Sequence, residues 1–249
     1  MNRDLLRLYA ITDRHCLKTL SPVGAEKSVS GAEERPTGMT AGELHDVSSL
    51  QADGEAEALA TAVEQAILGG ATMVQFREKE LTGARLEQDA LAVQAVCRKH
   101  GVPFIMNNDV ALAQKLDADG AHVGQSDMPA AEARRLLGPA KIIGVTARTV
   151  AEAQAAEAAG ADYLGSGAVF GTSTKHDAKT MPLETLRAIT ASVQIPVVAI
   201  GGISAANAGG LKSHGAAGLA VVSSLFGAAD ITEAAQALRA IADEVVADR

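Results

Sequence analysis

The sequence contains few aromatic residues, and this scarcity narrows the functions open to it. Phe, Tyr and Trp together make up 2% of the 249 residues, and Trp is absent. Proteins that bind single-stranded nucleic acid stack bases on aromatic side chains, and those that bind duplex backbones carry excess positive charge. The formal net charge here is −8. We therefore expect no nucleic-acid partner, although a local cluster of Lys and Arg could bind a small anion.

Cysteines and long apolar runs are equally scarce. The two cysteines, Cys16 and Cys97, fit neither a disulfide framework nor a metal site, and we expect two reduced thiols. No stretch is apolar enough over the roughly 20 residues that span a bilayer. The segment MNRDLLRLYAITDRH has charges within its apolar run, unlike a signal peptide. We expect a cytoplasmic protein without a membrane partner.

What the sequence does contain is an alternation of short apolar runs with Ala-rich segments of helical spacing. This alternation predicts an α/β fold with a parallel sheet and right-handed crossovers. Eight strand–helix pairs favour a closed (β/α)8 TIM barrel over a doubly wound open sheet. The expected strands are 8–12, 73–77, 104–108, 120–123, 141–146, 163–166, 197–200 and 218–222. The expected helices lie near 56–69, 84–99, 110–117, 130–137, 149–159, 183–191, 204–213 and 231–246.

Residues 18–54 interrupt this alternation. They are rich in Gly, Ser, Pro and Glu and contain few large apolar residues. Long irregular segments inside a compact domain are usually lids or disordered insertions. We expect one barrel domain over residues 1–249 with a flexible, non-catalytic insertion at about 18–54, and a functional lid is the alternative.

Two cations follow the second expected strand, at the end of the barrel where such folds place their chemistry. Arg77 and Lys79 lie two residues apart, so they point to the same side if the strand continues. Paired cations suit a polyanion such as diphosphate, whereas a salt bridge on the barrel rim is the structural alternative. Glu78 would point the other way and serve the structure.

Two carboxylates follow the third and fourth expected strands. Asp109 and Asp127 are placed to share one Mg²⁺, which usually takes one or two carboxylates together with waters and substrate phosphates. Each also precedes a helical segment, so helix capping is the alternative. Their position beside Arg77 and Lys79 favours the metal.

Glycine and hydroxyl residues follow the last three expected strands. Gly201-Gly202 and Ser223-Ser224 indicate a phosphate site, where backbone N–H groups approach an anion. The loop GTSTKHDA adds two hydroxyls and a Lys that could close over a phosphate. His122 lies inside a strand, and a hydrogen-bonded core residue is a better interpretation than a catalytic base. The whole pattern fits transfer chemistry with a departing pyrophosphate.

Seven segments, in order, resemble the thiamine-phosphate synthase family over roughly residues 5–15 and 55–230. They are LYAITDR, VQFREK, FIMNND, GAHVGQSDMP, IIGVTART, ADYLGSGAVFGTSTK and VVAIGGIS. The resemblance implies a barrel transferase that joins 4-amino-2-methyl-5-hydroxymethylpyrimidine diphosphate to 4-methyl-5-(2-phosphoethyl)thiazole, in plain or carboxylated form. Pyrophosphate leaves first, and the thiazole nitrogen captures the pyrimidine cation. The oligomeric state is left open.

The resemblance also assigns roles to individual residues. It implies that Asp109 and Asp127 are the Mg²⁺ ligands, and that Thr146, where the family has Ser, contacts the diphosphate. The other residues matched to the pyrimidine diphosphate are Gln75, Arg77, Lys79, Asn108 and Lys175. The residues matched to the thiazole phosphate are Thr172, Thr174, Gly202, Val222 and Ser223. Arg77, Lys79, Thr146 and Lys175 would act on the reacting groups.

The chain departs from the family pattern at two further positions. Ala168 replaces a usual Pro, and His176 stands where a second Lys is common. Two other functions remain open on this fold, a thiazole tautomerase-like isomerase and a non-catalytic sensor of phosphorylated ligands. The diphosphate and metal residues argue against both.

Overall fold

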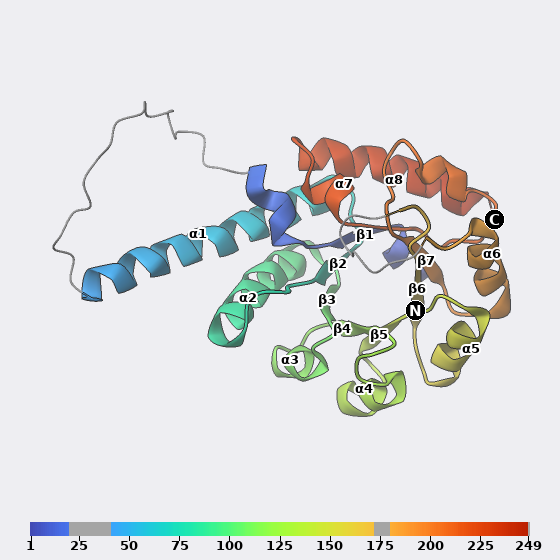
Figure 1. Cartoon of the computed structure of the whole chain (residues 1–249), viewed down its shortest axis with the longest axis horizontal. Helices are drawn as coiled ribbons and strands as arrows, with labels where there is room; N and C mark the ends of the chain where they lie inside the picture. The colour runs from blue at the N-terminus through green and yellow to red at the C-terminus, as the bar shows by residue number, and fades with distance from the viewer. Residues whose placement is uncertain (20–40, 172–179, 249) are drawn as a thin grey trace.

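The computed structural model describes residues 1–19, 41–171 and 180–248 and shows a closed parallel barrel (Figure 1). Each strand pairs with the next one in the chain, and β8 pairs with β1. The strands are β1 Leu8–Ile11, β2 Met73–Phe76, β3 Phe104–Asn107, β4 Gly120–Val123, β5 Ile142–Thr146, β6 Tyr163–Gly167, β7 Val197–Ile200 and β8 Leu219–Val221. The (β/α)8 prediction is confirmed.

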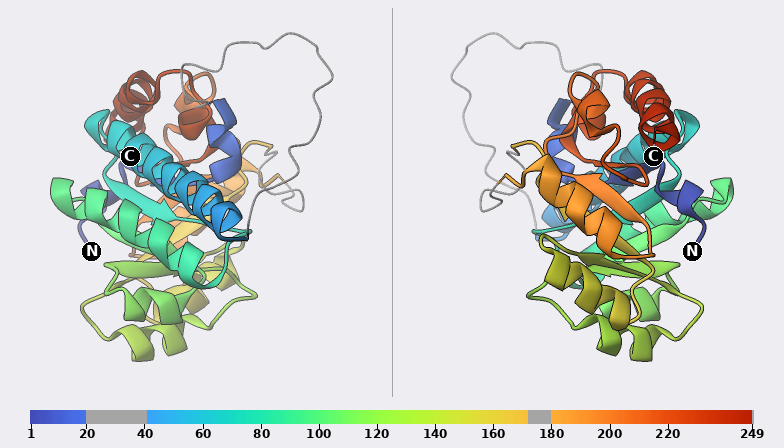
Figure 2. Two further views of the ribbon diagram at one scale, coloured as in Figure 1. Left: turned by 90° about the vertical axis from the view of Figure 1, so that its left-hand side faces the viewer. Right: turned by 90° about the vertical axis from the view of Figure 1, so that its right-hand side faces the viewer.

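Helices surround the strands, and α1 and α2 run side by side along the barrel wall (Figures 1 and 2). The α-helices are α1 Ala41–Leu68, α2 Gly83–His100, α3 Val110–Lys115, α4 Ala130–Leu137, α5 Val150–Ala158, α6 Leu183–Ser192, α7 Ser223–Phe226 and α8 Ile231–Ala247. Short 3₁₀ helices are η1 Arg3–Leu6, η2 Arg14–Thr19 and η3 Ala208–Leu211. No helix among the described residues is long and apolar enough to cross a membrane.

The helices differ from the sequence prediction in three places. Helix α1 begins at Ala41, so residues 41–54 of the expected insertion are helical, while 20–40 lie outside the described residues. Gly54 weakens the helical signal there, but extending a formed helix costs less than starting one. The helix expected at 204–213 is only the 3₁₀ turn η3, since Gly209 and Gly210 disfavour an α-helix. Helix α7 was not expected, because a short apolar run does not distinguish strand from helix.

Successive strand residues face opposite sides, which creates two separate cores. The outer core packs the strands against the helices and contains side chains such as Val74, Phe104 and Leu164. The inner core fills the barrel. Its buried members are Leu6, Tyr9, Ile11, Met73, Ile105, Tyr163, Val198, Ala217 and Ala220. Tyr9 and Tyr163 meet edge to face with ring centroids 5.8 Å apart.

Glycine makes room for the large rings in the inner core. A Cβ added at Gly144 would lie 2.1 Å from the Tyr163 ring and 2.5 Å from His122 Nδ1. Such distances are far below van der Waals contact. The third large ring, Tyr9, packs on Tyr163. A chain with few aromatic residues therefore still fills the barrel, because small residues stand opposite its large ones.

We predict that Gly144→Ala destabilises the protein, because the new methyl group overpacks the barrel interior. The expected loss is about 1–3 kcal/mol in the free energy of unfolding, the usual range for overpacked cores. Gly209→Ala is the matched control, since a Cβ there meets nothing within 4 Å. Urea unfolding of both variants measures the effect, and equal midpoints for the two variants would contradict the packing.

Candidate active site

A single pocket gathers residues from the carboxyl-terminal ends of the strands. Six sequence-predicted residues line it: Gln75, Arg77, Thr146, Gly202, Val222 and Ser223. The remaining lining residues are Tyr9, Ile11, Asn107, His122, Arg148, Gly165, Gly167, Ala168, Val198, Ile200, Gly201, Ile203, Ala220 and Val221. The structure thus places three residues matched to the diphosphate and three matched to the thiazole phosphate in one pocket, whereas Lys79 and Asn108 are not among its lining residues.

A chain of hydrogen bonds between side chains forms the floor of this pocket. Gln75 Nε2 donates to Tyr9 Oη at 2.7 Å, and Tyr9 Oη lies 2.7 Å from Tyr163 Oη. His122 shares a hydrogen bond with Tyr163 Oη through Nδ1 and with Thr146 Oγ1 through Nε2, each at 3.0 Å. Burial raises the pKa of both tyrosines above the ordinary value, so both hydroxyls stay neutral. His122 is the hydrogen-bonded core residue that the sequence favoured.

Arg77 is held in place by the end of β1. Its backbone N–H donates to Thr12 Oγ1 at 2.9 Å, and its Nη1 donates to Asp13 Oδ2 at 3.0 Å. Arg77 and Lys79 were expected to point to the same side if the strand continued. Strand β2 ends at Phe76, so that condition is not met. Arg77 lines the pocket, while Lys79 lies exposed in the following turn and is not a lining residue.

Glu78 supports the structure, as the sequence suggested. Its Oε1 accepts hydrogen bonds from the backbone N–H groups of Lys79 at 2.7 Å and of Glu80 at 2.8 Å. Burial acts to raise the pKa of Glu78, but hydrogen bonds from the Glu80 amide, Arg14 and the Lys79 amide outweigh it and lower the pKa. The carboxylate therefore stays ionised and keeps the turn after β2 in one conformation.

The two predicted metal ligands are each fixed by one backbone N–H group. Asp109 Oδ1 accepts from Leu112 at 2.8 Å and caps α3, as the capping alternative expected. Asp127 Oδ2 accepts from Gly124 at 2.7 Å and does not cap α4, whose N-cap is Pro129. Each of these hydrogen bonds uses one carboxylate oxygen and leaves the other oxygen of the same group for a ligand. Both carboxylates therefore fit Mg²⁺, which prefers oxygen ligands.

Additional acidic, histidine or cysteine ligands do not surround these two carboxylates in the described part of the chain. Across the residues that the structure describes, no group of three or more His, Cys, Asp or Glu side chains could hold a metal ion. Asn108, next to Asp109, is exposed and has φ 64°, a left-handed conformation that Asn tolerates. A Mg²⁺ here would depend on water and substrate oxygens for its other ligands.

The glycine pair after β7 serves close packing of the loop after β6. A Cβ at Gly202, where φ is +67°, would lie 2.1 Å from the carbonyl oxygen of Gly171. Phe170 N–H donates to Gly201 O at 2.9 Å in the same contact. After the neighbouring strand β8, Ser223 starts α7. The glycines therefore let the β6 loop lie directly against the end of β7.

Three predicted residues, Thr172, Thr174 and Lys175, lie outside the described residues. Besides Tyr9, two polar lining residues received no role from the sequence reasoning, Asn107 and Arg148. A signal for both existed, because Asn107 lies two residues after the inward-facing Ile105, and Arg148 lies two residues after Thr146. Counting alternate positions beyond each strand end would have found them.

Comparison with known proteins gives consistent matches. The family described as thiamine monophosphate synthase (TMP-TENI) matches residues 46–225. A thiamine-phosphate synthase of Chloroflexus aurantiacus is 51% identical over 180 residues, which is 72% of this chain and 83% of that relative. One from Ruminiclostridium cellulolyticum is 49% identical over 180 residues, or 72% of this chain and 86% of that relative.

A solved structure agrees with the fold and with these relatives. The thiamine phosphate pyrophosphorylase of Pyrococcus furiosus has a TM-score of 0.76 and 35% sequence identity, over 98% of this chain and 99% of that one. The family match covers most of the chain, and the pocket contains residues that the family resemblance assigned. The chain belongs to the thiamine monophosphate synthase family and is an enzyme of thiamine biosynthesis, a transferase with thiamine-phosphate synthase activity.

Proposed function

We propose that this enzyme joins 4-amino-2-methyl-5-hydroxymethylpyrimidine diphosphate to 4-methyl-5-(2-phosphoethyl)thiazole and releases pyrophosphate. The observation that carries the proposal is the single pocket lined both by Gln75 and Arg77 and by Gly202 and Ser223. The first pair stands at the end proposed for the diphosphate. The second pair stands at the end proposed for the thiazole phosphate, which the carboxylated thiazole would share.

The proposed reaction is dissociative. The bond between the pyrimidine methylene carbon and the diphosphate oxygen breaks, and its electron pair leaves with pyrophosphate. The thiazole nitrogen then donates its lone pair to the methylene carbon of the pyrimidine cation, and the thiazole becomes a thiazolium. No proton is transferred in these steps, so the hydrogen bond between Thr146 and His122 would orient the hydroxyl rather than activate a nucleophile. Positive side chains then matter most, because negative charge collects on the leaving group.

The described residues supply the groups that this reaction needs. Arg77, fixed by Asp13, presents a guanidinium suited to a diphosphate. Thr146 accepts or donates one hydrogen bond with His122, which orients its hydroxyl toward its proposed diphosphate contact. Apolar lining residues, among them Ile11, Val198 and Ile200, exclude water that would otherwise capture the cation. We assign Lys79, Asn108 and Lys175 to the diphosphate on the family resemblance.

Mg²⁺, bound by Asp109 and Asp127, would neutralise charge on the diphosphate when present. The isomerase and sensor alternatives are not favoured, since relatives near 50% identity are named thiamine-phosphate synthases. The direct test is to mix both substrates with the enzyme, with and without Mg²⁺, and to measure pyrophosphate and thiamine phosphate. Absence of both products with active substrates would refute the proposal.

We predict that Asp109→Asn and Asp127→Asn each lower turnover by on the order of 100-fold, because each loses a charged metal ligand worth several kcal/mol. Asn remains a good N-cap, so Asp109→Asn should keep α3 capped and the melting temperature unchanged. The measurement is kcat against Mg²⁺ concentration, together with thermal unfolding. Asp230→Asn, at the N-cap of α8, is the matched control and should keep full activity. Wild-type rates at limiting Mg²⁺ in both site variants would refute the shared metal.

We predict that Lys175→Ala slows the chemical step itself. Loss of one charged contact to a developing anion costs about 2.7–4 kcal/mol, by analogy with oxyanion-hole deletions. Rapid-quench product formation with excess enzyme and saturating substrates measures this step directly. An unchanged single-turnover rate with weaker binding alone would make Lys175 a docking residue.

A further inference from the structure

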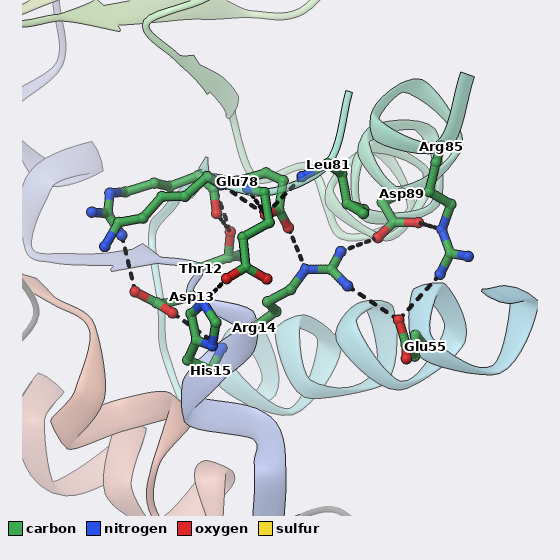
Figure 3. Close-up of polar contacts among 12 residues, drawn as sticks. Thr12, Asp13, Arg14, His15, Glu55, Glu78, Leu81, Arg85 and Asp89 are labelled. Carbon is green, nitrogen blue, oxygen red and sulfur yellow. Dashed lines mark hydrogen bonds and ion pairs between the residues drawn. The ribbon is translucent and has the colours of Figure 1, made fainter. Parts of the chain in front are cut away.

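The turn that carries Arg77 and Lys79 is attached to a cluster of charged side chains behind it. Figure 3 shows Arg14 at the centre of this cluster, between Glu78 on one side and Asp89 and Glu55 on the other. These residues come from separate elements: Arg14 from η2, Glu78 from the turn after β2, Asp89 from α2 and Glu55 from α1. One guanidinium therefore joins three parts of the barrel wall.

The contacts of Arg14 use every nitrogen of its guanidinium. Nε donates to Glu78 Oε2 at 2.5 Å, Nη2 to Asp89 Oδ2 at 2.6 Å and Nη1 to Glu55 Oε2 at 3.2 Å. The side chain of Glu78 is 3% exposed and that of Asp89 is 0% exposed. Arg85, one turn before Asp89 on α2, donates to the other Asp89 oxygen at 2.9 Å. Lysine could not replace this arrangement, since an ammonium lacks the planar fork.

Glu78 passes this restraint on to the backbone of the turn. While one carboxylate oxygen is held by Arg14, the other accepts the backbone N–H groups of Lys79, Glu80 and Leu81. The residue before Arg14, Asp13, holds the Arg77 side chain from the opposite side. Two consecutive residues at the end of β1 thus fix both halves of the segment 77–81.

Stability alone is a weak reason for such a cluster. Buried ion pairs often stabilise a fold no better than apolar side chains of the same volume, because desolvation offsets the attraction. Such ion pairs do fix the orientation of the side chains that form them, since several charge-assisted hydrogen bonds define one geometry. Among the described residues, the segment that carries Arg77 connects these contacts with the pocket.

We infer that Arg14 is a positioning residue of this enzyme, which fixes the turn after β2 through Glu78 and thereby sets the affinity for the diphosphate group. The inference rests on the proposed binding of diphosphate by Arg77 and Lys79. Arg14 is not a catalytic residue, because it is not among the residues that line the pocket. Its influence should therefore be confined to one of the two substrates.

The test compares Arg14→Lys with a matched control, Arg134→Lys. Arg134 also makes several contacts, to the carbonyl oxygens of Gly138 and Lys141 and to Asp162, but these lie before β5 and β6, at the opposite end of the barrel. Both variants should lower the melting temperature. Calorimetric titration with inorganic pyrophosphate in the presence of Mg²⁺, and KM for each substrate, separate positioning from stability.

We predict that Arg14→Lys weakens pyrophosphate binding and raises KM for the pyrimidine diphosphate by about 10- to 100-fold, the range expected when the support of a binding group is lost. KM for the thiazole phosphate should stay unchanged. Arg134→Lys should change neither constant. Glu78→Gln keeps the side-chain volume and an oxygen for the three amides, and it should shift the same constants by a smaller factor.

Three outcomes would overturn the inference: an Arg14→Lys enzyme with both KM values of the wild type, an equal rise for both substrates, or an effect matched by Arg134→Lys. If Arg14→Lys does not fold, unchanged binding and KM values in Glu78→Gln overturn the inference instead.

The variant Arg77→Ala separates failure of this inference from failure of the proposed function. If Arg77→Ala weakens pyrophosphate binding and Arg14→Lys does not, only the positioning role fails. If Arg77→Ala also has no effect, the diphosphate assignment itself is wrong.

Discussion

The eight strands close into a barrel, and this closure decides which side chains can occupy its interior. In a barrel of eight parallel strands every second side chain must fit a narrow interior, which is just wide enough to be filled. Part of this interior is apolar, with Met73 and Ile105 among its buried side chains. Gln75, His122 and Thr146 face the pocket, and each of these side chains is hydrogen-bonded to another side chain of the barrel interior. The polar floor of the pocket is thus continuous with the inner core of the barrel.

Pairing of consecutive strands also explains why residues far apart in the chain act on one segment. Strands β1 and β2 are hydrogen-bonded neighbours although more than 60 residues separate Ile11 from Met73. The residues that follow β1 therefore lie beside the residues that follow β2. Asp13 and Arg14 meet Arg77 and Glu78 for this reason. Residues 20–40 belong to the connection between β1 and β2 and lie outside the described residues. The two strands are paired from Tyr9 with Met73 to Ile11 with Gln75.

Much of this arrangement could be predicted from the sequence, and the exceptions have physical causes. Strand positions followed from apolar runs and were correct to within one or two residues. The ion pair of Arg77 with Asp13 was missed, because it joins residues 64 positions apart and depends on how both side chains lie once β1 and β2 are paired. Asp109 and Asp127 look alike in the sequence, yet only Asp109 caps a helix. The difference is set by where α4 begins, and helix ends are poorly fixed by local pattern.

The hydrogen-bond chain on the pocket floor has a consequence for how this sequence can change over time. Its five members, Gln75, Tyr9, Tyr163, His122 and Thr146, come from five different strands. Replacing an inner member by an apolar residue removes one hydrogen bond from each of its two neighbours, and losing hydrogen bonds to buried polar atoms is costly. A tolerated replacement must therefore arrive with a compensating one on a neighbouring strand. We therefore expect substitutions at these five positions to occur together in related sequences rather than one at a time.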